Sequence, residues 1–474
     1  MNSLIQYKTT ILPLLIAGVL ACFGRLPKAE AVVPAPDGGY PGGNTAEGQN
    51  ALLSRTTGGF NTAVGWFSLE SLTTGSYNTG VGAGTLVLNT GDSNTAVGTG
   101  ALLLNTSGSL NVAVGTNALV FNDSGTLNNA VGALALYNNI DGFANNAFGV
   151  AALSSNITAT GNTAVGSNAL QNNDSTGNGV ANGNTAVGFS ALNHNIDGSA
   201  NTAVGEEALS FNDIGFQNTA VGSAALLNNT TGGANTANGR SALSNNTTGS
   251  SNTATGVNAL AGNTAGNFNT AIGIGALSGN TLGDENIALG HNAGNSVIMA
   301  ANVICIGAAG ENVSDSCYIG QIFGATSASG TAVFINSAGK LGTSTSSRRF
   351  KEEIKPMDQA SEALFALQPV TFRYRKEIDA VGTSQFGLVA EDVEKVNPDL
   401  VVRDKEGKPY SVRYEQVNTM LLNEFLKEHR KNEEQEATIA RQQKQIEALA
   451  TGLQKVSDKV ELNRSAPQIV VNHQ

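Results

Sequence analysis

The segment NTAVGFSALNHNIDGSA, residues 184–200, is one unit of a repeat that decides the fold of the first two thirds of this chain. NTAVG or a close variant begins sixteen times, at residues 44, 61, 78, 94, 111, 128, 145, 162, 184, 201, 218, 235, 252, 269, 286 and 303. The step is seventeen residues, except for one step of sixteen and one of twenty-two. The longest step contains the polar insertion NNDSTGNGVANG, and the register is the same on both sides of it.

Two positions of the repeat hardly vary. The fifth residue is Gly in every copy, as at Gly188, and the ninth is Leu in the first fourteen, as at Leu192. Glycine permits a positive φ or a close backbone approach, and Asn-rich and Gly-rich segments favour turns. Each unit is therefore predicted to form a short strand, a Gly corner, a second apolar segment and a turn.

One such unit cannot bury its own apolar face, but stacked units can, with Val over Val and Leu over Leu. The pattern predicts a mainly β protein, with a parallel β-roll or solenoid of sixteen coils over residues 44–310. A disordered low-complexity tract would not keep the Gly and Leu register over this length.

The composition narrows the choice of partners and activities. The formal net charge is −11, and Arg55 and Arg240 are the only basic residues between Lys28 and Lys340. A nucleic acid needs a basic surface, so we expect no nucleic acid partner.

An enzyme that acts on an external substrate is one alternative function. It would need paired carboxylates in a fixed setting, whereas the acidic residues of the repeats occupy variable positions, as at Asp92, Asp141, Glu206 and Glu207. The sequence therefore does not favour it.

Cysteine and histidine give no metal-ligand spacing. Cys305 and Cys317 lie in the short apolar runs NVICIG and SCYIG, and the four His are scattered. We expect no metal and no cofactor. A buried Cys behaves as a small hydrophobe, which is the interpretation we favour, and a disulfide between the two remains open.

The N-terminus has the features of an export signal. Lys8 precedes the apolar run ILPLLIAGVLACF, and AEA at residues 29–31 fits a small-residue cleavage site. We expect a signal peptide over residues 1–31, cut after Ala31, then a short N-terminal segment over 32–43. The alternative is a lipoprotein signal ending at Cys22. Either predicts an exported protein, extracellular or at the cell surface, with no transmembrane span in the mature chain, because a run of this length is too short to cross a bilayer.

The content of basic residues rises sharply after the repeats. Twenty of its 26 Lys and Arg lie from Arg348 onward. We expect a β-rich transition over residues 311–345 and a small α+β domain over 346–430. In that domain we expect a helix over 351–367, with Asp358 as its N-cap and a buried stripe of Ala363, Leu364 and Leu367.

The last helical stretch carries a heptad pattern that predicts a coiled coil over residues 431–462, followed by a tail over 463–474. A monomeric amphipathic helix is the alternative, and the pattern alone does not fix the number of strands. The core positions are Ile439, Ile446, Leu453 and Val460, with Gln442, Leu449 and Val456.

The NTAVG…AL pattern resembles the head repeats of trimeric autotransporter adhesins. That resemblance implies a left-handed parallel β-roll in which three chains pack side by side. Alanine at the third position, as at Ala63, Ala96 and Ala113, would suit a close approach of neighbouring chains.

The ordered blocks SSRRFKEEIKPM, LQPVTFRYR, FGLVAEDVEKVNPDLV and YSVRYEQVNTMLL resemble the intramolecular chaperone auto-processing domain of endosialidases and phage fibres, over roughly residues 346–462. The resemblance implies a domain that trimerises, templates folding of the fibre before it and then cuts itself off with a Ser/Lys dyad. Carried over, the nucleophile is Ser346, the base is Lys351 and the cut bond is Thr345–Ser346. Relatives often have Asp after the serine, whereas this chain has Ser347, which leaves Ser347 as a second candidate nucleophile.

These residue types suit the chemistry. A serine hydroxyl needs a base, and a neutral lysine amine serves as one; burial and nearby positive charge, here Arg348 and Arg349 if they point inward, favour the neutral amine. We therefore expect an exported homotrimeric fibre that is a peptidase only toward itself. The alternative is an adhesin or phage-tail-fibre-like binding protein that keeps its C-terminal domain and takes a surface glycan or cell-surface ligand.

Overall fold

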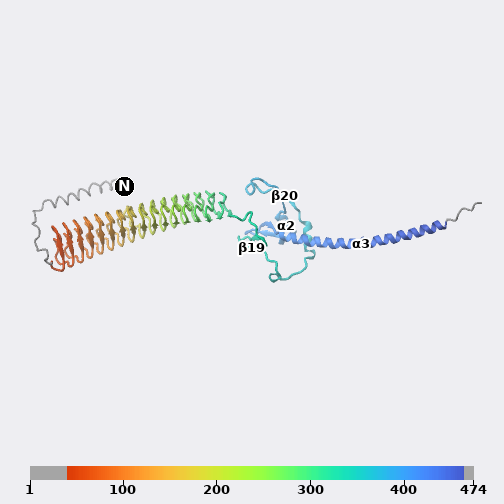
Figure 1. The fold of residues 1–474 in the computed structure, drawn as a ribbon, viewed down its shortest axis with the longest axis horizontal. Coiled ribbons are helices and arrows are strands. Elements are labelled where there is room, and N and C mark those ends of the chain that lie inside the picture. Colours follow the sequence, from red (N-terminus) through yellow and green to blue (C-terminus); the bar gives the residue numbers. More distant parts are fainter. Residues whose placement is uncertain (1–39, 464–474) are drawn as a thin grey trace, which may run out of the picture. The chain divides into compact units, whose positions relative to one another are not determined.

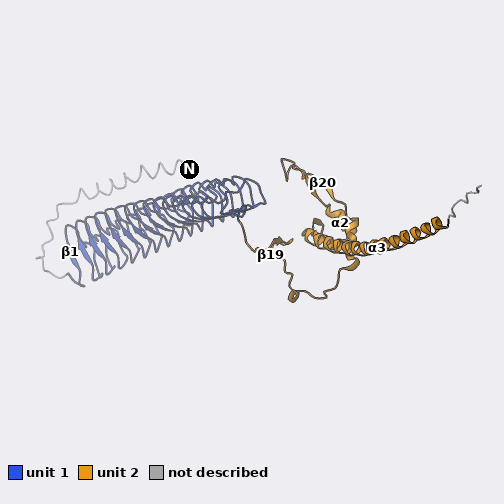
Figure 2. Cartoon of the chain, turned by 45° about the vertical axis from the view of Figure 1, so that its right-hand side comes forward, with its two compact units in different colours: residues 1–325 blue, residues 326–474 orange. Residues whose placement is uncertain are grey.

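The computed structural model describes residues 40–463 and divides the chain into two compact units, residues 1–325 and 326–474 (Figure 2). The expected signal peptide and the tail from residue 464 lie outside the described residues.

The first unit is a parallel β-solenoid with one three-residue strand per repeat copy (Figure 1). Each strand pairs in register with the strand of the next copy, so that Thr62 lies beside Thr79 and Val64 beside Val81. The predicted fold is confirmed. The strands are β1 (Thr45–Glu47), β2 (Thr62–Val64), β3 (Thr79–Val81), β4 (Thr95–Val97), β5 (Val112–Val114), β6 (Asn129–Val131), β7 (Asn146–Phe148), β8 (Thr163–Val165), β9 (Thr185–Val187), β10 (Thr202–Val204), β11 (Thr219–Val221), β12 (Thr236–Asn238), β13 (Thr253–Thr255), β14 (Thr270–Ile272), β15 (Ile287–Leu289) and β16 (Ile304–Ile306).

The third residue of each repeat points into the coil, and the second and fourth point out of it. Ala186 is fully buried, whereas Val187 keeps 36% of its surface exposed. Successive side chains of a strand face opposite sides, so Ala and Val cannot share the core. Val therefore stacks over Val as expected, but on the outside of the coil rather than in its core. The expectation that the third-position Ala meets a neighbouring chain is wrong for the same reason, since Ala63, Ala96 and Ala113 are fully buried inside their own coils.

The ninth-position Leu residues form the core column that the sequence predicts. Leu192 and Leu209 are fully buried, and the Leu192 N–H donates to the carbonyl of Ala208 in the next coil at 2.9 Å. The structure also places these residues at positive φ, with Leu192 at +49°. A branched side chain rarely adopts this conformation, and no sequence signal indicated it. Leu192 lies in the turn segment that follows the glycine corner.

Glycine at the fifth position is required by both backbone conformation and space. Gly132 has a φ of +136°, and a Cβ there would lie 2.4 Å from the carbonyl oxygen of Gly149 in the next coil. The corner can therefore hold only glycine.

Two columns of buried Asn stabilise the turns, a role beyond the turn-forming one that the sequence indicated. In the first-position column, Asn201 N–H donates to Asn184 Oδ1 at 3.0 Å, and its Nδ2 donates to the Gly215 carbonyl at 2.8 Å. In the twelfth-position column, Asn212 Nδ2 donates to Asn195 Oδ1 at 2.7 Å. Every buried side-chain nitrogen and oxygen in residues 40–463 has a hydrogen-bond partner.

A seventeenth strand, β17 (Cys317–Ile319), extends the sheet beyond the last repeat and pairs in parallel with β16. Cys305 is buried and Cys317 is exposed, because they occupy an inward and an outward position of adjacent strands. Both thiols are free, and side chains on opposite faces cannot form a disulfide without backbone movement. Burial raises the pKa of the Cys305 thiol, and the nearby Cys317 raises it further. Cys305 is thus a core residue, as favoured.

The second unit holds three short antiparallel hairpins and the helices. Its elements are β18 (Val333–Ile335), β19 (Leu341–Thr343), the 3-10 helix η1 (Arg348–Phe350), the 3-10 helix η2 (Asp358–Ala366), β20 (Val370–Phe372), β21 (Gln385–Gly387), α2 (Ala390–Val396), the 3-10 turn η3 (Pro398–Leu400), β22 (Val401–Arg403), β23 (Pro409–Val412) and α3 (Tyr414–Leu462). β18 pairs with β19, β20 with β21 and β22 with β23.

The core of this unit is small. It joins Val393, Leu400, Val401, Val412 and Met420, and the expected stripe of Ala363, Leu364 and Leu367 packs against it.

The expected helix over 351–367 forms only from Asp358 onward. The structure has a 3-10 helix from Asp358, with Met357 rather than Asp358 in the N-cap position. Pro356 explains the late start, since proline lacks an N–H and pushes the residue before it out of the helical region.

Candidate functional site

Ser346 and Lys351 lie on either side of η1. The turn closes through hydrogen bonds from Phe350 N–H to the Ser347 carbonyl at 3.0 Å and from Lys351 N–H to the Arg348 carbonyl at 3.2 Å. This reversal brings Lys351 Nζ to 3.1 Å from Ser346 Oγ, within hydrogen-bond distance. The residues predicted as base and nucleophile are therefore in contact.

The predicted cut bond lies in an extended, exposed stretch. Residues 344–347 have no regular structure and connect the end of β19 to η1. Ser347 has φ −66° and ψ 139°, and its side chain forms no capping hydrogen bond. A carbonyl in such a stretch takes no part in a helix or sheet, so it is accessible to attack.

The two arginines that follow the serine do not point inward in the single chain. Arg348 and Arg349 are both exposed, and the Arg349 guanidinium lies over the Phe350 ring at 4.5 Å from its centroid. Ser346 and Lys351 are exposed as well. The single chain thus brings Lys351 into contact with Ser346 and places positive charge nearby, but it leaves both side chains exposed to solvent.

A second polar cluster, which the sequence did not reveal, joins η2 to α3. Ser361 is fully buried and donates to Glu424 Oε1, while Asn423 Nδ2 donates to Ser361 Oγ at 2.7 Å. Lys427 Nζ bonds Glu424 Oε1 at 2.7 Å and Ser361 Oγ at 3.3 Å. The hydrogen bond from Lys427 and then that from Ser361 lower the pKa of Glu424.

This cluster also contains a serine and a lysine, but its geometry indicates a structural role. Lys427 is ion-paired with Glu424 at 2.7 Å, and Ser361 is closed off from solvent, so neither group is free to react with a peptide bond. Only the spacing of Glu424 and Lys427, three residues apart on one helix, gave a local signal. Their contact with Ser361 spans more than sixty residues of sequence.

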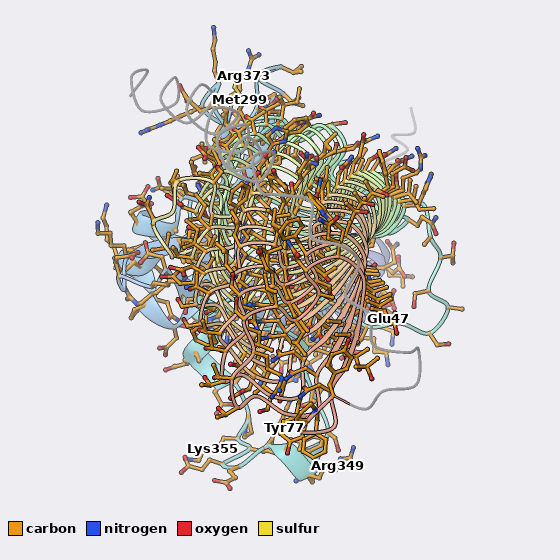
Figure 3. The ribbon with its side chains drawn as sticks, turned by 90° about the vertical axis from the view of Figure 1, so that its left-hand side faces the viewer. Glu47, Tyr77, Met299, Arg349, Lys355 and Arg373 are labelled. Carbon is orange, nitrogen blue, oxygen red and sulfur yellow. The ribbon has the colours of Figure 1, made fainter. Side chains whose placement is uncertain are left out.

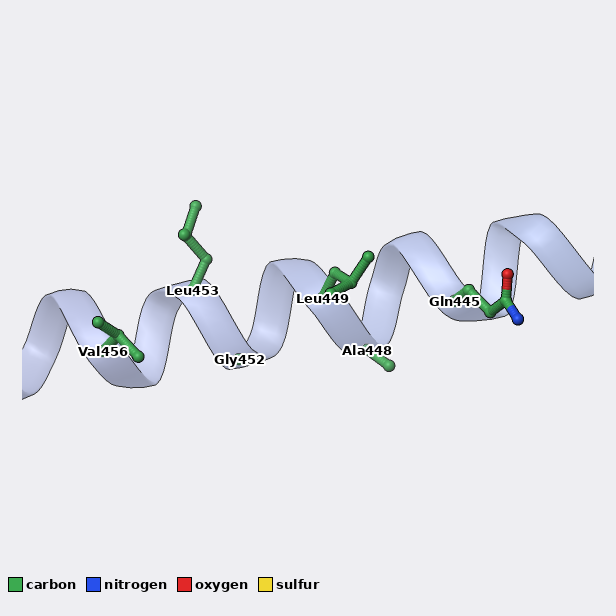
Figure 4. A pocket seen from close by; sticks show the side chains of 6 residues that line it. All are labelled: Gln445, Ala448, Leu449, Gly452, Leu453 and Val456. Carbon is green, nitrogen blue, oxygen red and sulfur yellow. The ribbon is translucent and has the colours of Figure 1, made fainter.

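α3 exposes the apolar heptad seam predicted from the sequence. A shallow groove on this helix is lined by Gln445, Ala448, Leu449, Gly452, Leu453 and Val456 (Figure 4). Leu449 is 73% exposed and Leu453 is 74% exposed. Nearer the start of the helix, Leu421 and Phe425 are also exposed. Within residues 40–463, no part of the single chain covers these side chains.

Two further observations concern only residues 40–463. No group of three or more His, Cys, Asp and Glu is placed to hold a metal ion. No helix in this part of the chain has the length and apolar character needed to cross a membrane.

Comparison with known proteins gives one match. Residues 346–402 match the family model described as the chaperone of endosialidase, whose name also classifies it as a peptidase family. The match begins at Ser346 and includes Lys351, and it confirms the resemblance of the C-terminal region. No curated protein and no solved structure matches the chain. A match of this kind that follows a β-solenoid indicates a tail-fibre-like protein.

Proposed function

We propose that this protein is an exported homotrimeric fibre whose C-terminal region acts as a folding chaperone and then cuts itself off at the Thr345–Ser346 bond. The contact between Lys351 Nζ and Ser346 Oγ at 3.1 Å, inside the stretch that matches a peptidase family, carries the proposal.

The reaction needs no cofactor. Ser346 Oγ attacks the carbonyl carbon of Thr345, Lys351 accepts the hydroxyl proton, and the same proton passes to the departing amide nitrogen of Ser346. The product is an ester between the Thr345 carbonyl and Ser346 Oγ, with a free amino group on Ser346. Water then adds to the ester, which releases the Thr345 carboxylate and restores the serine hydroxyl. Each chain reacts once.

Assembly would activate the base. An exposed lysine is protonated at neutral pH, and burial near Arg348 and Arg349 would favour the neutral amine. Because the single chain leaves Lys351 in solvent, we propose that neighbouring copies cover it and that cleavage follows trimer formation.

The uncovered apolar surface of the second unit supports assembly. The α3 seam, with Leu449 and Leu453, fits a coiled coil, and exposed Leu421 and Phe425 extend the apolar surface toward the start of the helix. A lone helix with such a seam would gain stability by pairing with copies of itself.

The shaft explains why a chaperone would be needed. A parallel sheet forms slowly, and its unpaired edges are prone to aggregation until the next coil is added. A C-terminal seed that holds three chains at the same height would let coils form in register.

Expression of the full chain and of single variants tests the dyad. We expect the wild type to yield one fragment that ends at Thr345 and one that begins at Ser346, as measured by intact mass. Ser346→Ala and Lys351→Ala should each remain full-length with no detectable cleavage. Ser347→Ala and Lys355→Ala are the matched controls and should be cut as the wild type is.

The dyad assignment is wrong if the Ser346 and Lys351 variants still give both fragments. Loss of cleavage in Ser347→Ala alone would make Ser347 the nucleophile. A wild-type chain that stays full-length would favour the alternative, a fibre-like binding protein that retains its C-terminal domain.

A further inference from the structure

The stretch that carries Ser346 and Lys351 has almost no packing of its own in the single chain. We call it the dyad arm and define it as residues 346–357. Residues 346–356 are all exposed, and Met357 packs against the core of the second unit. Arg349 and Lys355, near the two ends of the dyad arm, carry their side chains on the outside of the ribbon (Figure 3). The place of Lys351 therefore depends on how the dyad arm is held where it enters η2.

Two residues with unusual backbone conformations set the direction of the chain at this point. Glu353 has a φ of +50°, and Asp358, the first residue of η2, has a φ of +44°. Residues other than glycine adopt a positive φ rarely, although Asp does so more readily than most, and they keep it where the surrounding structure holds them. At Asp358 a holding group is present, because Asn423 of α3 donates from Nδ2 to the Asp358 carbonyl at 3.2 Å.

Asn423 belongs to the polar cluster that joins η2 to α3. We call this cluster the clamp and define it as Ser361, Asn423, Glu424 and Lys427. Asn423 Nδ2 also donates to Ser361 Oγ at 2.7 Å, and Ser361 donates to Glu424. Lys427 Nζ bonds Glu424 at 2.7 Å and lies 3.8 Å from Glu362 of η2. Ser361 is fully buried and Glu424 is 8% exposed, so buried hydrogen bonds as well as apolar contacts tie η2 to one short stretch of α3.

The clamp and the apolar seam lie on the same helix. α3 runs without interruption from Tyr414 to Leu462, and it carries the clamp residues in its first third and Leu449 and Leu453 farther along. A helix rises by a fixed distance per residue, so the clamp holds the dyad arm at a fixed height relative to the seam. Copies joined through the seam would therefore present their dyad arms at the same height.

We infer that Asn423 and Glu424 are positioning residues for self-cleavage: the clamp fixes the dyad arm to α3, so that assembly through α3 places neighbouring copies over Lys351. This inference rests on the proposed function and adds the contact that couples assembly to cleavage. Hydrogen bonds are directional, so the clamp fixes the Asp358 carbonyl in a way that apolar contacts alone would not.

The pH dependence of cleavage reports whether Lys351 is covered. The base must be a neutral amine; burial near positive charge lowers the pKa of a lysine, whereas a solvent-exposed lysine keeps a pKa of about 10.4. The charged residues beside Lys351 in the chain are Arg348 and Arg349 before it and Glu352 and Glu353 after it, and the variants below leave them unchanged. A loose dyad arm would therefore slow cleavage at neutral pH and regain the rate at alkaline pH. A merely weaker fold would lower the yield of trimer without moving the midpoint of the rate.

A pH jump with the full chain tests the inference. The chain is assembled by dilution from urea at about pH 5, where a lysine amine is protonated and cleavage waits, and is then shifted to higher pH values. The hydrogen bonds from Lys427 and then from Ser361 lower the pKa of Glu424. The stability that this carboxylate contributes is lost only as the pH falls through the lowered pKa, so the clamp is formed during assembly. Sedimentation measures the trimer before the jump, and denaturing gels measure the cut fraction over time after it.

The two test variants change the clamp in different ways. Glu424→Gln removes the buried charge, and Asn423→Ala removes the bond to the Asp358 carbonyl without changing any charge. Asp392→Asn is the matched control. Like Glu424, Asp392 pairs at 2.7 Å with a lysine three residues along its helix, but it lies on α2 and its side chain is 63% exposed.

We expect trimers of the wild type and of Asp392→Asn to be cut at the same rate. Trimers of Glu424→Gln and Asn423→Ala should be cut about tenfold more slowly at neutral pH, which corresponds to a rise of one unit in the pKa of the base. The midpoint of their rate should move to higher pH, so that their rates approach that of the wild type at about pH 10.

Three results would overturn the positioning role, and either variant that assembles is enough to decide. The first is a wild-type rate and midpoint in the variant trimers. The second is a slower rate with an unchanged midpoint, which would show a structural defect that leaves Lys351 covered. The third is failure of both variants to assemble when Asp392→Asn does, since the clamp would then serve assembly itself. A wild-type chain that stays monomeric, or a wild-type trimer that is never cut, would instead overturn the proposed function, and this result is visible without any clamp variant.

Discussion

Backbone conformation at single residues determines which side chains each coil accepts. Gly132 combines a φ of +136° with a close approach to the next coil, so both strain and space exclude a side chain. Leu192 adopts a positive φ as well, but its side chain fills the core. Burial of an apolar side chain of this size contributes about 1.5–3 kcal/mol, which offsets strain of about 1–3 kcal/mol.

Replacement of glycine at the corner should destabilise the shaft more than replacement of a glycine at a nearby turn, because only the corner combines a positive φ with a close approach to the next coil. For Gly132→Ala we expect a loss of at least 1–3 kcal/mol, roughly the strain alone, with further cost from the clash with Gly149. Gly183→Ala is the control, because a Cβ there meets nothing within 4 Å and Ala200 adopts a similar φ at the same repeat position. Thermal unfolding followed by β-sheet circular dichroism measures both. Equal melting temperatures for the two variants would refute the steric role of the corner.

The pairing of Ser346 with Lys351 could be predicted from the sequence only through family resemblance. A serine and a lysine five residues apart are common on surfaces, and nothing in the local pattern indicated that η1 would bring their side chains together. The Ser361 cluster could not be predicted from the sequence, because its contacts join residues from η2 and α3 that lie far apart in the chain.

At the scale of single elements, periodicity predicted where the strands lie but not which way their side chains face. A three-residue strand shows only one alternation, so the pattern Thr-Ala-Val does not say whether Ala or Val is inside. Small buried Ala is favoured because the coil is narrow and Leu from the ninth position already fills it. In η2 the expected apolar stripe was correct, whereas the helix begins later than the pattern predicted.

The seam of α3 should control assembly. Leu449→Asp combined with Leu453→Asp places charge on the coiled-coil core, and we expect the trimer to dissociate at micromolar concentration with little loss of monomer helicity. Thr451→Asp combined with Lys444→Asp, on the opposite face of the helix, should leave the trimer intact. Sedimentation analysis of the full chain checks this. A trimer in the seam variant would show that α3 takes no part in assembly.

At the scale of the whole molecule, the proposed cleavage would make the C-terminal region a temporary chaperone, and the formation of the shaft would then depend on different factors from its persistence. Each coil bonds only to its neighbours, so the shaft can form coil by coil from a seeded end. Under the proposed function, a shaft that unfolds after the C-terminal region has been cut off would have no template. Its durability then depends on the unfolding rate rather than on an equilibrium.

Heating and cooling should therefore affect cut and uncut chains differently. We expect Ser346→Ala, which keeps its C-terminal region, to recover most of its β-sheet signal after thermal unfolding, and the cleaved wild type to recover several-fold less. Ser347→Ala, which is still cut, should behave as the wild type does. Full recovery of the cleaved shaft would show that the C-terminal region is not needed as a template.

The seventeen-residue register also has a consequence for how such proteins diversify. Adding or removing one repeat changes the length of the solenoid by about 4.8 Å and leaves every other coil unchanged. Recombination between near-identical repeats would thus change the length of the solenoid in increments of one coil. The twenty-two-residue step at residues 162–184 is a case already present: Asp174, which accepts hydrogen bonds from the backbone of Thr158 and Gly179, holds the extra loop while the register continues.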